Sequence, residues 1–404
     1  MESSDIPKLK ISIVPFVKGA DYSSIQYVYV KKESNLAPIQ GEMDEREPSP
    51  IYAATHIFLD NAIELSKYPS LEYQKEYNDY NWDEQTYIQF LGHFVEAPIA
   101  EQGENHIVFF PKVSELFFFK ESALQKIPFD EFQKTEPKLA KELINALDPK
   151  ITESWPLFGI MVCDPTPDWT NQYEALYKGL YQSPREKWKS YLVYNYQFPT
   201  EDELKKLKGI VVSGSKLSAY DKVEWFSDFG ALLKSIINEQ STTKVYGACF
   251  GAQFIAHALG GKVSQMNLKG IPKCMNREKI ALKESQIELL NQMSKELSLD
   301  KEFLAVECHT DHVEEPPAGA KVIGTSEMTP VEMYEIGKTV LCTQFHPEFN
   351  AYYMQKRLFP RLTKLYKPNW SNIDEIIDAH VKQLYTTRCD NAKFNSFLKK
   401  WLKS

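Results

Sequence analysis

The 404-residue sequence lacks closely spaced cysteines, long hydrophobic runs and an excess of basic charge. A net charge of -8 at pH 7 argues against a nucleic-acid backbone or an anionic membrane surface as the main partner. No CxxC pair is present, which argues against a zinc site and a disulfide framework. Each of the six cysteines is therefore expected to be a free thiol: Cys163, Cys249, Cys274, Cys308, Cys342 and Cys389.

Targeting signals are also missing. No run approaches the roughly 18 apolar residues that a membrane-spanning helix needs, so no membrane insertion is expected. The first residues, MESSDIPKLKISIVPF, have neither the basic start and apolar core of a secretory signal nor the Arg-rich character of a transit peptide. We therefore expect a cytoplasmic protein, with a length typical of about two or three domains.

A regular alternation of strand and helix patterns begins at Pro156. A capping box formed by Thr200 and Glu203 marks the start of one of the helices. The predicted strands are 157–163, 189–196, 209–215 and 243–249, and the predicted helices are 169–181, 200–207 and 225–240. This alternation predicts an α/β fold with a mostly parallel sheet covered on both faces and an active site at the C-terminal ends of its strands.

The first part of the chain has a different organisation. Strands are predicted at 10–17, 24–32 and 105–113, and helices at 50–68 and 136–147. Residues 148–156 read as a linker, and the C-terminal end is helical. We therefore predict an α+β domain at 1–150, an α/β domain at 156–365 and a C-terminal helical extension at 366–404.

Cys249 stands between Gly247 and Gly251, where a predicted strand turns into a predicted helix. The glycines remove side chains where the turn brings backbones close together. The positive end of the helix would favour a thiolate, and the N–H of Phe250 could face an oxyanion, as in a nucleophile elbow. A buried, unreactive cysteine fits the same turn equally well, so the turn alone does not distinguish the two.

Two further strand ends favour the nucleophile. His346 and Glu348 lie two residues apart after the strand in TVLCTQFHPEF, so that Glu348 can orient His346 as a general base for Cys249. Ser213-Gly214-Ser215 follows another strand, where backbone N–H groups can face a developing oxyanion. Alone, these segments would read as a surface turn and a simple strand-to-helix turn.

Residues from about 156 to 365 resemble the class I glutamine amidotransferase domain, and within it the stand-alone γ-glutamyl peptidase-like members most. The resemblance rests on GACFGAQ, SGSKLSAYDKVEW, QFHPEF and the stretch ECHTDHVEEPPAGAKVIGTSEMTPVEMYEIG, which occur in the family's order. It implies a flavodoxin-like parallel sheet. It also implies hydrolysis of a γ-glutamyl amide through a thioester, on a small glutamine-, glutathione- or γ-glutamyl-conjugate-like substrate and without a cofactor.

The same resemblance assigns roles to individual residues. Cys249 would be the nucleophile, His346 the base and acid, and Glu348 the residue that orients His346. The N–H groups of Phe250 and of the Gly214-Ser215 turn would form the oxyanion hole. The γ-glutamyl group would be seated by Gln253 and His309.

Some positions depart from the family pattern without removing the triad. Lys216, Ala248 and Ala252 stand where relatives carry other residues, which puts specificity in doubt more than chemistry. His309, Asp311 and His312 could be imagined as metal ligands. Their spacing also fits a capped surface loop and no fourth ligand is apparent, so no metal is expected.

Residues 1 to about 150 resemble a degenerate Nudix domain, which implies an α/β/α sandwich. Counting from Gly41 puts Glu47 at the offset of the Nudix signature, and residues 55–63 then occupy its nine-residue core. His56 and Leu59 stand where the signature has glutamates, and only Asp60 keeps an acid. Because Mg²⁺ needs several oxygen ligands, diphosphate hydrolysis is not expected.

Three functions remain open from the sequence. The first is the cysteine γ-glutamyl hydrolase. The second is a non-catalytic assembly subunit with a protein partner, built from two enzyme-derived domains. The third is nucleotide sensing through the inactive Nudix-like domain. The chain has neither a P-loop nor a pyrophosphatase-type glycine loop, so it contains no synthase that would receive ammonia.

Overall fold

The chain forms two compact units in the computed structural model, the first of residues 1–155 with 174–187 and the second of residues 156–173 with 188–404. Cys274 and Cys389 lie outside the described residues, as do the Nudix signature positions Glu47 and Ile63. The described residues are 9–18, 25–31, 38–43, 49–62, 91, 94–95, 97–102, 106–113, 124–238, 242–266, 277–282, 302–386 and 390–404.

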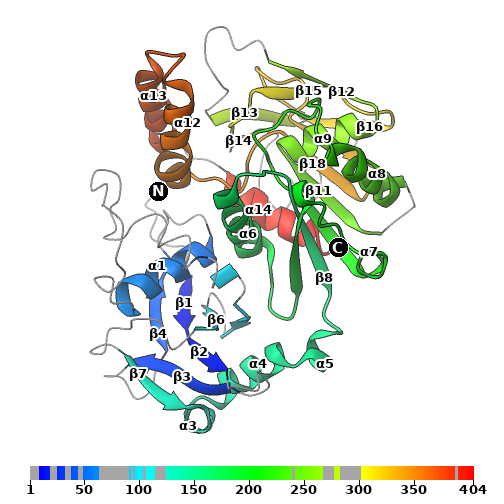
Figure 1. The fold of residues 1–404 in the computed structure, drawn as a ribbon. Helices are drawn as coiled ribbons and strands as arrows, with labels where there is room; N and C mark the ends of the chain where they lie inside the picture. The colour runs from blue at the N-terminus through cyan, green and yellow to red at the C-terminus, as the bar shows by residue number, and fades with distance from the viewer. Residues whose placement is uncertain are drawn as a thin grey trace. The chain divides into compact units, whose positions relative to one another are not determined.

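A nine-stranded sheet forms the centre of the second unit (Figure 1). Its parallel core consists of β8 (Leu157–Val162), β10 (Leu207–Val212), β11 (Lys244–Ala248) and β18 (Val340–Thr343). The remaining strands are β9 (Lys187–Leu192), β13 (Arg277–Leu282), β14 (Glu302–Val306), β16 (Ala320–Thr325) and β17 (Met333–Ile336), in the order β14-β13-β16-β17-β18-β11-β10-β8-β9. The predicted α/β fold with a parallel core is confirmed, and an antiparallel extension that starts at β17 adds to it.

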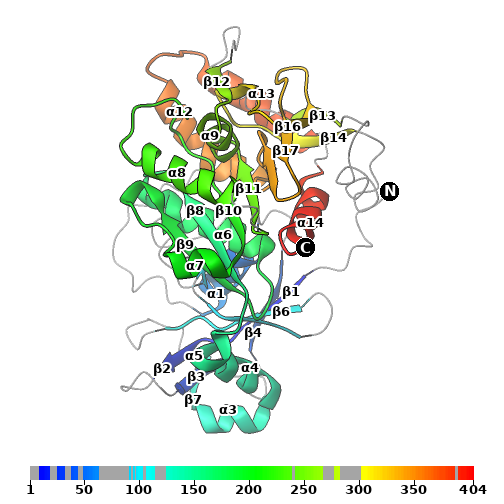
Figure 2. The ribbon, with the colours of Figure 1, turned by 90° about the vertical axis from the view of Figure 1, so that its right-hand side faces the viewer.

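The helices of this unit cover both faces of the sheet (Figure 2). Ile210 packs with residues of α8 and α9, whereas a side chain on its neighbour Gly209 would face Leu402 beyond the end of α14. Successive strand residues point to opposite faces, so these helices lie on opposite sides. The helices are α6 (Pro167–Tyr181), α7 (Glu201–Lys206), α8 (Trp225–Asn238), α9 (Phe250–Ala258), α11 (Ala351–Tyr353), α12 (Phe359–Tyr366), α13 (Ile373–Thr386) and α14 (Asn391–Trp401).

Local sequence signals explain where several of these elements begin. The expected capping box is present, with the N–H of Glu203 donating to Thr200 Oγ1 and the N–H of Thr200 donating to Glu203 Oε2. β8 is buried over its whole length, as expected for a parallel strand covered on both faces. A two-stranded ribbon of β12 (Lys262–Gln265) and β15 (Asp311–Glu315) packs beside α9.

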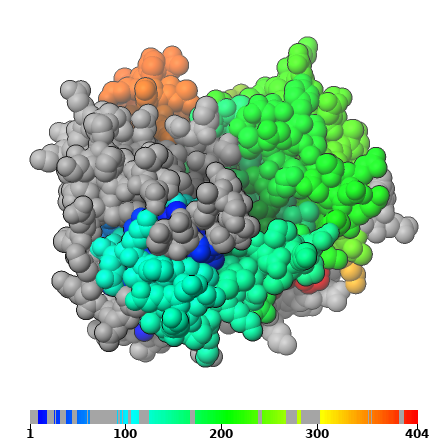
Figure 3. All heavy atoms as spheres, turned by 60° about the horizontal axis from the view of Figure 1, so that its bottom comes forward, coloured from blue at the N-terminus to red at the C-terminus, as the bar shows by residue number. Residues whose placement is uncertain are grey.

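The described residues of the first unit form two small sheets. One is mixed and has the order β4-β1-β6-β5, and the other is antiparallel and has the order β2-β3-β7. The strands are β1 (Lys10–Ile13), β2 (Phe16–Lys18), β3 (Ile25–Lys31), β4 (Ile39–Glu42), β5 (Ile99–Glu101), β6 (His106–Phe109) and β7 (Leu124–Pro128), and the helices are α1 (Pro50–Ala62), α3 (Phe129–Thr135), α4 (Pro137–Leu147) and α5 (Pro149–Thr152). Figure 3 shows α3 to α5, in teal, on one face of this unit. None of the helices that the structure describes is long and apolar enough to cross a membrane.

The second half of α6 groups with the first unit, although the strand and helix pattern placed it in the α/β domain. Ser49 Oγ donates a buried hydrogen bond of 2.8 Å to the carbonyl of Ala175. A side chain at Gly179 would come within 2.3 Å of the same hydroxyl. Periodicity predicts the helix but carries no information about which core its second half joins.

Candidate active site

Cys249 occupies a strained turn at the end of β11. Its φ of 51° is rare for a residue other than glycine, and Cys249 is the N-cap of α9. The flanking glycines are required sterically: a Cβ on Gly247 would lie 2.9 Å from the carbonyl carbon of Gly251, and a Cβ on Gly251 would lie 2.3 Å from the carbonyl oxygen of Val212. The strand-turn-helix geometry is that of the predicted elbow.

His346 and Glu348 lie just beyond the end of β18. The His346 ring donates through Nδ1 to Glu348 Oε1 at 2.8 Å, and both side chains are buried. The ring of Phe349 stacks on the imidazole, with centroids 4.3 Å apart and planes 11° apart. One face of the imidazole and its Nδ1 are therefore fixed, which leaves Nε2 to face another group.

The sheet brings these two strand ends together, because β11 and β18 are parallel neighbours. The N–H of Cys249 donates to the carbonyl of Thr343 at 2.8 Å, three residues before His346. Burial alone would lower the pKa of His346, but the charges of Cys249 and Glu348 and hydrogen bonds to both side chains raise it well above its usual value. These neighbours thus favour the charged form of the imidazole over the neutral form.

The loop after β10 lies against this pair. A Cβ on Gly214 would lie 3.2 Å from His346 Cε1 and 3.9 Å from Cys249 Cβ. Phe250 follows Cys249 as the first residue of α9, where N–H groups have no partner within the helix. Ser215 turns its hydroxyl away and donates to the carbonyl of Cys163 at 3.1 Å. Gly214 and Phe250 therefore flank Cys249. The hydrogen bond from Ser215 ties the loop after β10 to the residue that follows β8.

Two buried carboxylates anchor the rest of this loop. Asp164 accepts from the N–H of Lys216 at 2.9 Å and from the N–H of Thr166 at 2.8 Å. Asp311 accepts from Ser218 Oγ at 2.5 Å and from Tyr220 Oη at 3.2 Å. The loop that would carry the oxyanion N–H groups is thus held at both ends by charge-assisted hydrogen bonds.

Gln253 and His309 meet at the backbone of Asp311. Gln253 Nε2 donates to the carbonyl of Asp311 at 2.8 Å and to Gln344 Oε1 at 3.1 Å, and His309 Nδ1 donates to the same carbonyl at 2.9 Å. The expected capped surface loop is wrong for this segment, because His309 and Asp311 are 2% and 5% exposed. The reason is that the Asp311 carboxylate accepts hydrogen bonds from Ser218 and Tyr220 in the loop after β10, and not from its own turn. No group of three metal-ligating side chains is found among the described residues.

Glu332 belongs to a buried polar cluster beside His309. Its Oε1 accepts from Ser326 Oγ at 2.7 Å, and burial together with the charge of Glu307 raises its pKa well above the usual value. A raised folded-state pKa means that stability is complete below the unfolded pKa and is lost as the pH rises through the folded one. Glu332→Gln mimics the protonated form, so its unfolding free energy should exceed that of the wild type by about 1 kcal/mol or more at pH 8.

This comparison requires urea unfolding of both proteins at several pH values. The difference in unfolding free energy should shrink toward zero as the pH falls to about 4, because Glu332 is then protonated in both states. A difference that stays constant from pH 4 to pH 8 would contradict the expectation.

Three residues near the site were missed from the sequence. Tyr173 is buried, and its hydroxyl lies 3.1 Å from the position that a Cβ on Gly214 would take. Burial, the charge of Asp164 and other nearby groups raise the pKa of Tyr173, which keeps the phenol neutral. Asn391 and Asn395 on α14 hydrogen-bond the loop that carries His346. The available signal was their helical spacing among Phe394, Phe397 and Leu398, since asparagine is disfavoured both in helix interiors and in cores.

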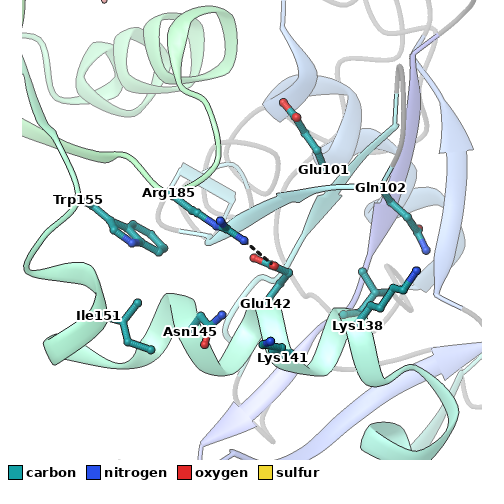
Figure 4. Close-up of a pocket in the computed structure, with 10 residues that line it drawn as sticks. Glu101, Gln102, Lys138, Lys141, Glu142, Asn145, Ile151, Trp155 and Arg185 are labelled. Atoms are coloured by element: carbon teal, nitrogen blue, oxygen red, sulfur yellow. Dashed lines mark hydrogen bonds and ion pairs between the residues drawn. The ribbon is translucent and has the colours of Figure 1, made fainter.

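The first unit contains a separate cavity of about 680 Å³ beside α4 (Figure 4). An ion pair crosses it, with Arg185 Nη2 3.0 Å from Glu142 Oε1. The lining combines three cationic side chains with two carboxylates, so it does not select for a ligand of one charge. Its residues are Glu101, Gln102, Lys138, Leu139, Lys141, Glu142, Asn145, Ile151, Trp155 and Arg185.

The chain is similar to several known proteins. The family model for glutamine amidotransferase class-I matches residues 171–363. Gamma-glutamyl peptidase 4 of Arabidopsis thaliana is 34% identical over 178 residues, which cover 44% of this chain and 68% of the peptidase. Gamma-glutamyl peptidase 3 of the same plant is 33% identical over 165 residues, which cover 41% and 64%. A crystal structure of a glutamine amidotransferase from Thermotoga maritima superposes with a TM-score of 0.45 at 15% identity and covers 62% of this chain and 99% of that one.

Proposed function

Because the chain belongs to the glutamine amidotransferase class-I family, we propose that it is a cysteine-dependent hydrolase of γ-glutamyl amides. The observation that carries the proposal is the convergence of three side chains at neighbouring strand ends. A Cβ on Gly214 would lie 3.2 Å from His346 Cε1 and 3.9 Å from Cys249 Cβ, and His346 Nδ1 lies 2.8 Å from Glu348 Oε1. The names of the two plant relatives support a γ-glutamyl substrate class, and the matched segments span about two thirds of their length.

In the proposed mechanism the sulfur of Cys249 attacks the γ-carbonyl carbon of the substrate while His346 holds the thiol proton. N–H groups of Phe250 and of the Gly214-Ser215 turn stabilise the oxyanion. The C–N bond then breaks, His346 gives the proton to the departing amine, and a γ-glutamyl thioester remains on Cys249. Water attacks the thioester with His346 as base, which releases glutamate and restores the thiol.

Glu348 acts on this sequence through His346. Its carboxylate holds Nδ1 at 2.8 Å, so that the opposite ring nitrogen carries the transferred proton. Gln253 and His309 are proposed to seat the γ-glutamyl group through the loop at Asp311, which both of them contact. The substrate is proposed to be glutamine-, glutathione- or γ-glutamyl-conjugate-like.

The proposal is tested with the purified full chain and three substrates: glutamine, glutathione and γ-glutamyl-p-nitroanilide. We expect release of glutamate from at least one of them. With hydroxylamine added, γ-glutamyl hydroxamate should form at the expense of glutamate, because the thioester is open to a second nucleophile. A well-folded chain that releases no glutamate from any γ-glutamyl compound would remove the proposal.

The Nudix-like character of the first unit remains a prediction, as do the cytoplasmic location and a protein partner. Gly41 on β4 is compatible with the Nudix-like prediction, since a Cβ there would lie 2.8 Å from side-chain atoms of Ile57 on α1, which would have to shift to admit it. His56 and Leu59 are buried, with exposures of 6% and 0%. Two of the signature positions that would offer oxygen ligands thus carry side chains that pack in the core, which supports a non-hydrolytic role for this unit.

A further inference from the structure

Helix α14 carries two asparagines on the side that it buries. Asn391 and Asn395 are 7% and 8% exposed, and the other buried residues of the same helix are apolar: Phe394, Phe397, Leu398 and Trp401. A buried carboxamide costs free energy unless its polar atoms find partners. The partners of these two residues therefore indicate what they are for.

Both carboxamides donate to the loop that presents the catalytic histidine. Asn391 Nδ2 lies 2.9 Å from the carbonyl of His346 and 2.7 Å from the carbonyl of Phe349. Asn395 Nδ2 lies 2.7 Å from the carbonyl of Pro347. Three carbonyls within four consecutive residues thus receive hydrogen bonds from one helix face. The His346 N–H is also held, by the carbonyl of Val306 at 2.9 Å.

The helix itself is fixed to the strands beneath it. Phe394 stacks on Phe303 of β14, with centroids 5.8 Å apart, and meets Phe345 edge to face at 5.1 Å. Asp390 closes a pair of hydrogen bonds with Leu304, from its own N–H to the carbonyl and from the Leu304 N–H to its carboxylate. The two asparagines therefore sit between a rigid sheet and the histidine loop, and they cannot move without unpacking this contact.

From this arrangement we propose that Asn391 and Asn395 are positioning residues. Their hydrogen bonds hold the loop so that the imidazole of His346 stays directed at the sulfur of Cys249. The inference rests on the proposed function, because it takes His346 as the base. It assigns a role in the active site to a helix that lies beyond the matched family segment, which ends at residue 363. On this proposal α14, which lies within the predicted C-terminal extension, supports the active site.

The test uses the full chain and does not require a known substrate. Iodoacetamide alkylation of Cys249 at neutral pH is followed by mass spectrometry of the peptide that contains it, since a correctly placed imidazole activates the thiol. Asn391→Ala and Asn395→Ala should each slow alkylation by about tenfold, the scale expected for a catalytic group displaced by a fraction of an ångström to one ångström. His346→Gln sets the lower reference rate.

Two further variants separate positioning from packing. Ser396→Ala changes an exposed neighbour on α14 and should leave the rate within twofold of the wild type. Asn395→Asp keeps the shape but places an acceptor against the Pro347 carbonyl, so it should slow alkylation at least as much as Asn395→Ala. If an alanine variant does not fold, Asn395→Asp alone decides, since it leaves no cavity.

Two results would overturn the proposal. The first is a lowered melting temperature of the asparagine variants with alkylation within twofold of the wild type, which is the signature of a merely structural role. The second is alkylation in the wild type that His346→Gln does not slow, because the histidine would then not act on Cys249. Neither result depends on glutamate release. Glutamate release tests the proposed function, whereas the alkylation rate of Cys249 tests this inference, so the two can fail independently. Where glutamate release is measurable, kcat should fall in parallel with alkylation while KM changes little.

Discussion

Replacing Cys249 with alanine should lower kcat for glutamate release by about 10,000-fold or more, the scale seen when a nucleophile that acts as part of a triad is removed. The thioester cannot form without the sulfur, and the neighbouring N–H groups alone give only weak catalysis. The measurement is steady-state release of glutamate from the best substrate in the panel. Residual release at more than a few per cent of the wild-type rate would show that another group performs the attack.

A matched control comes from the cysteine on the adjacent strand. Cys342 is fully buried on β18, and burial raises the pKa of its thiol to about 12, so it stays protonated and unreactive. Cys342→Ala should keep kcat within about threefold of the wild type while it lowers stability by about 1 kcal/mol through the small cavity it leaves. The contrast separates loss of the nucleophile from loss of any buried thiol.

Cys249→Gly tests the strain at the same position. Glycine adopts a φ of 51° without the penalty that a side chain meets there, so this variant should be inactive yet more stable than the wild type by about 1 kcal/mol. An increase in urea midpoint together with loss of glutamate release is the expected result. A Cys249→Gly protein that is less stable than the wild type would mean that the positive φ of Cys249 does not cost the folded protein free energy.

The central part of the site could be predicted because its signals are local. Apolar runs bounded by glycines mark β10 and β11, and the crowding around Gly247 and Gly251 requires the glycines that mark the turn. The hydrogen bond between His346 and Glu348 follows from their spacing in extended chain. The parallel order of strands then brings their C-terminal ends together.

Other features could not be predicted, because they depend on contacts between distant segments. Asp311 reads as the cap of its own loop, and its real partners, Ser218 and Tyr220, lie about 90 residues away. Asn391 and Asn395 reach the histidine loop across more than 40 residues. A sequence shows that such a polar residue is unusual on an apolar helix face, but the carbonyl that satisfies it is defined only when the strands and helices pack.

The second large effect is expected at Gly251, which lies on the turn of α9 that follows Cys249. An added Cβ would stand 2.3 Å from the carbonyl oxygen and 2.9 Å from the carbonyl carbon of Val212, which are backbone atoms of β10 and cannot rotate away. Gly251→Ala should therefore lower the free energy of unfolding by about 3 kcal/mol or more, as expected for overpacking against backbone. Because α9 must shift from β10, Cys249 and the N–H of Phe250 move as well, and kcat should fall by about a hundredfold.

Gly230 offers the matched control for this substitution. It lies within α8, and a Cβ there would meet only the Cβ of Ala258 at 3.7 Å, an ordinary contact. Gly230→Ala should raise the free energy of unfolding by about 0.5 to 1 kcal/mol, because alanine restricts the unfolded chain and favours the helix. Urea unfolding of both variants, with glutamate release measured on the folded fraction, tests the pair. Equal stability of the two variants would mean that α9 can move away from β10 freely, and the close approach at the turn would then not hold Cys249 in place.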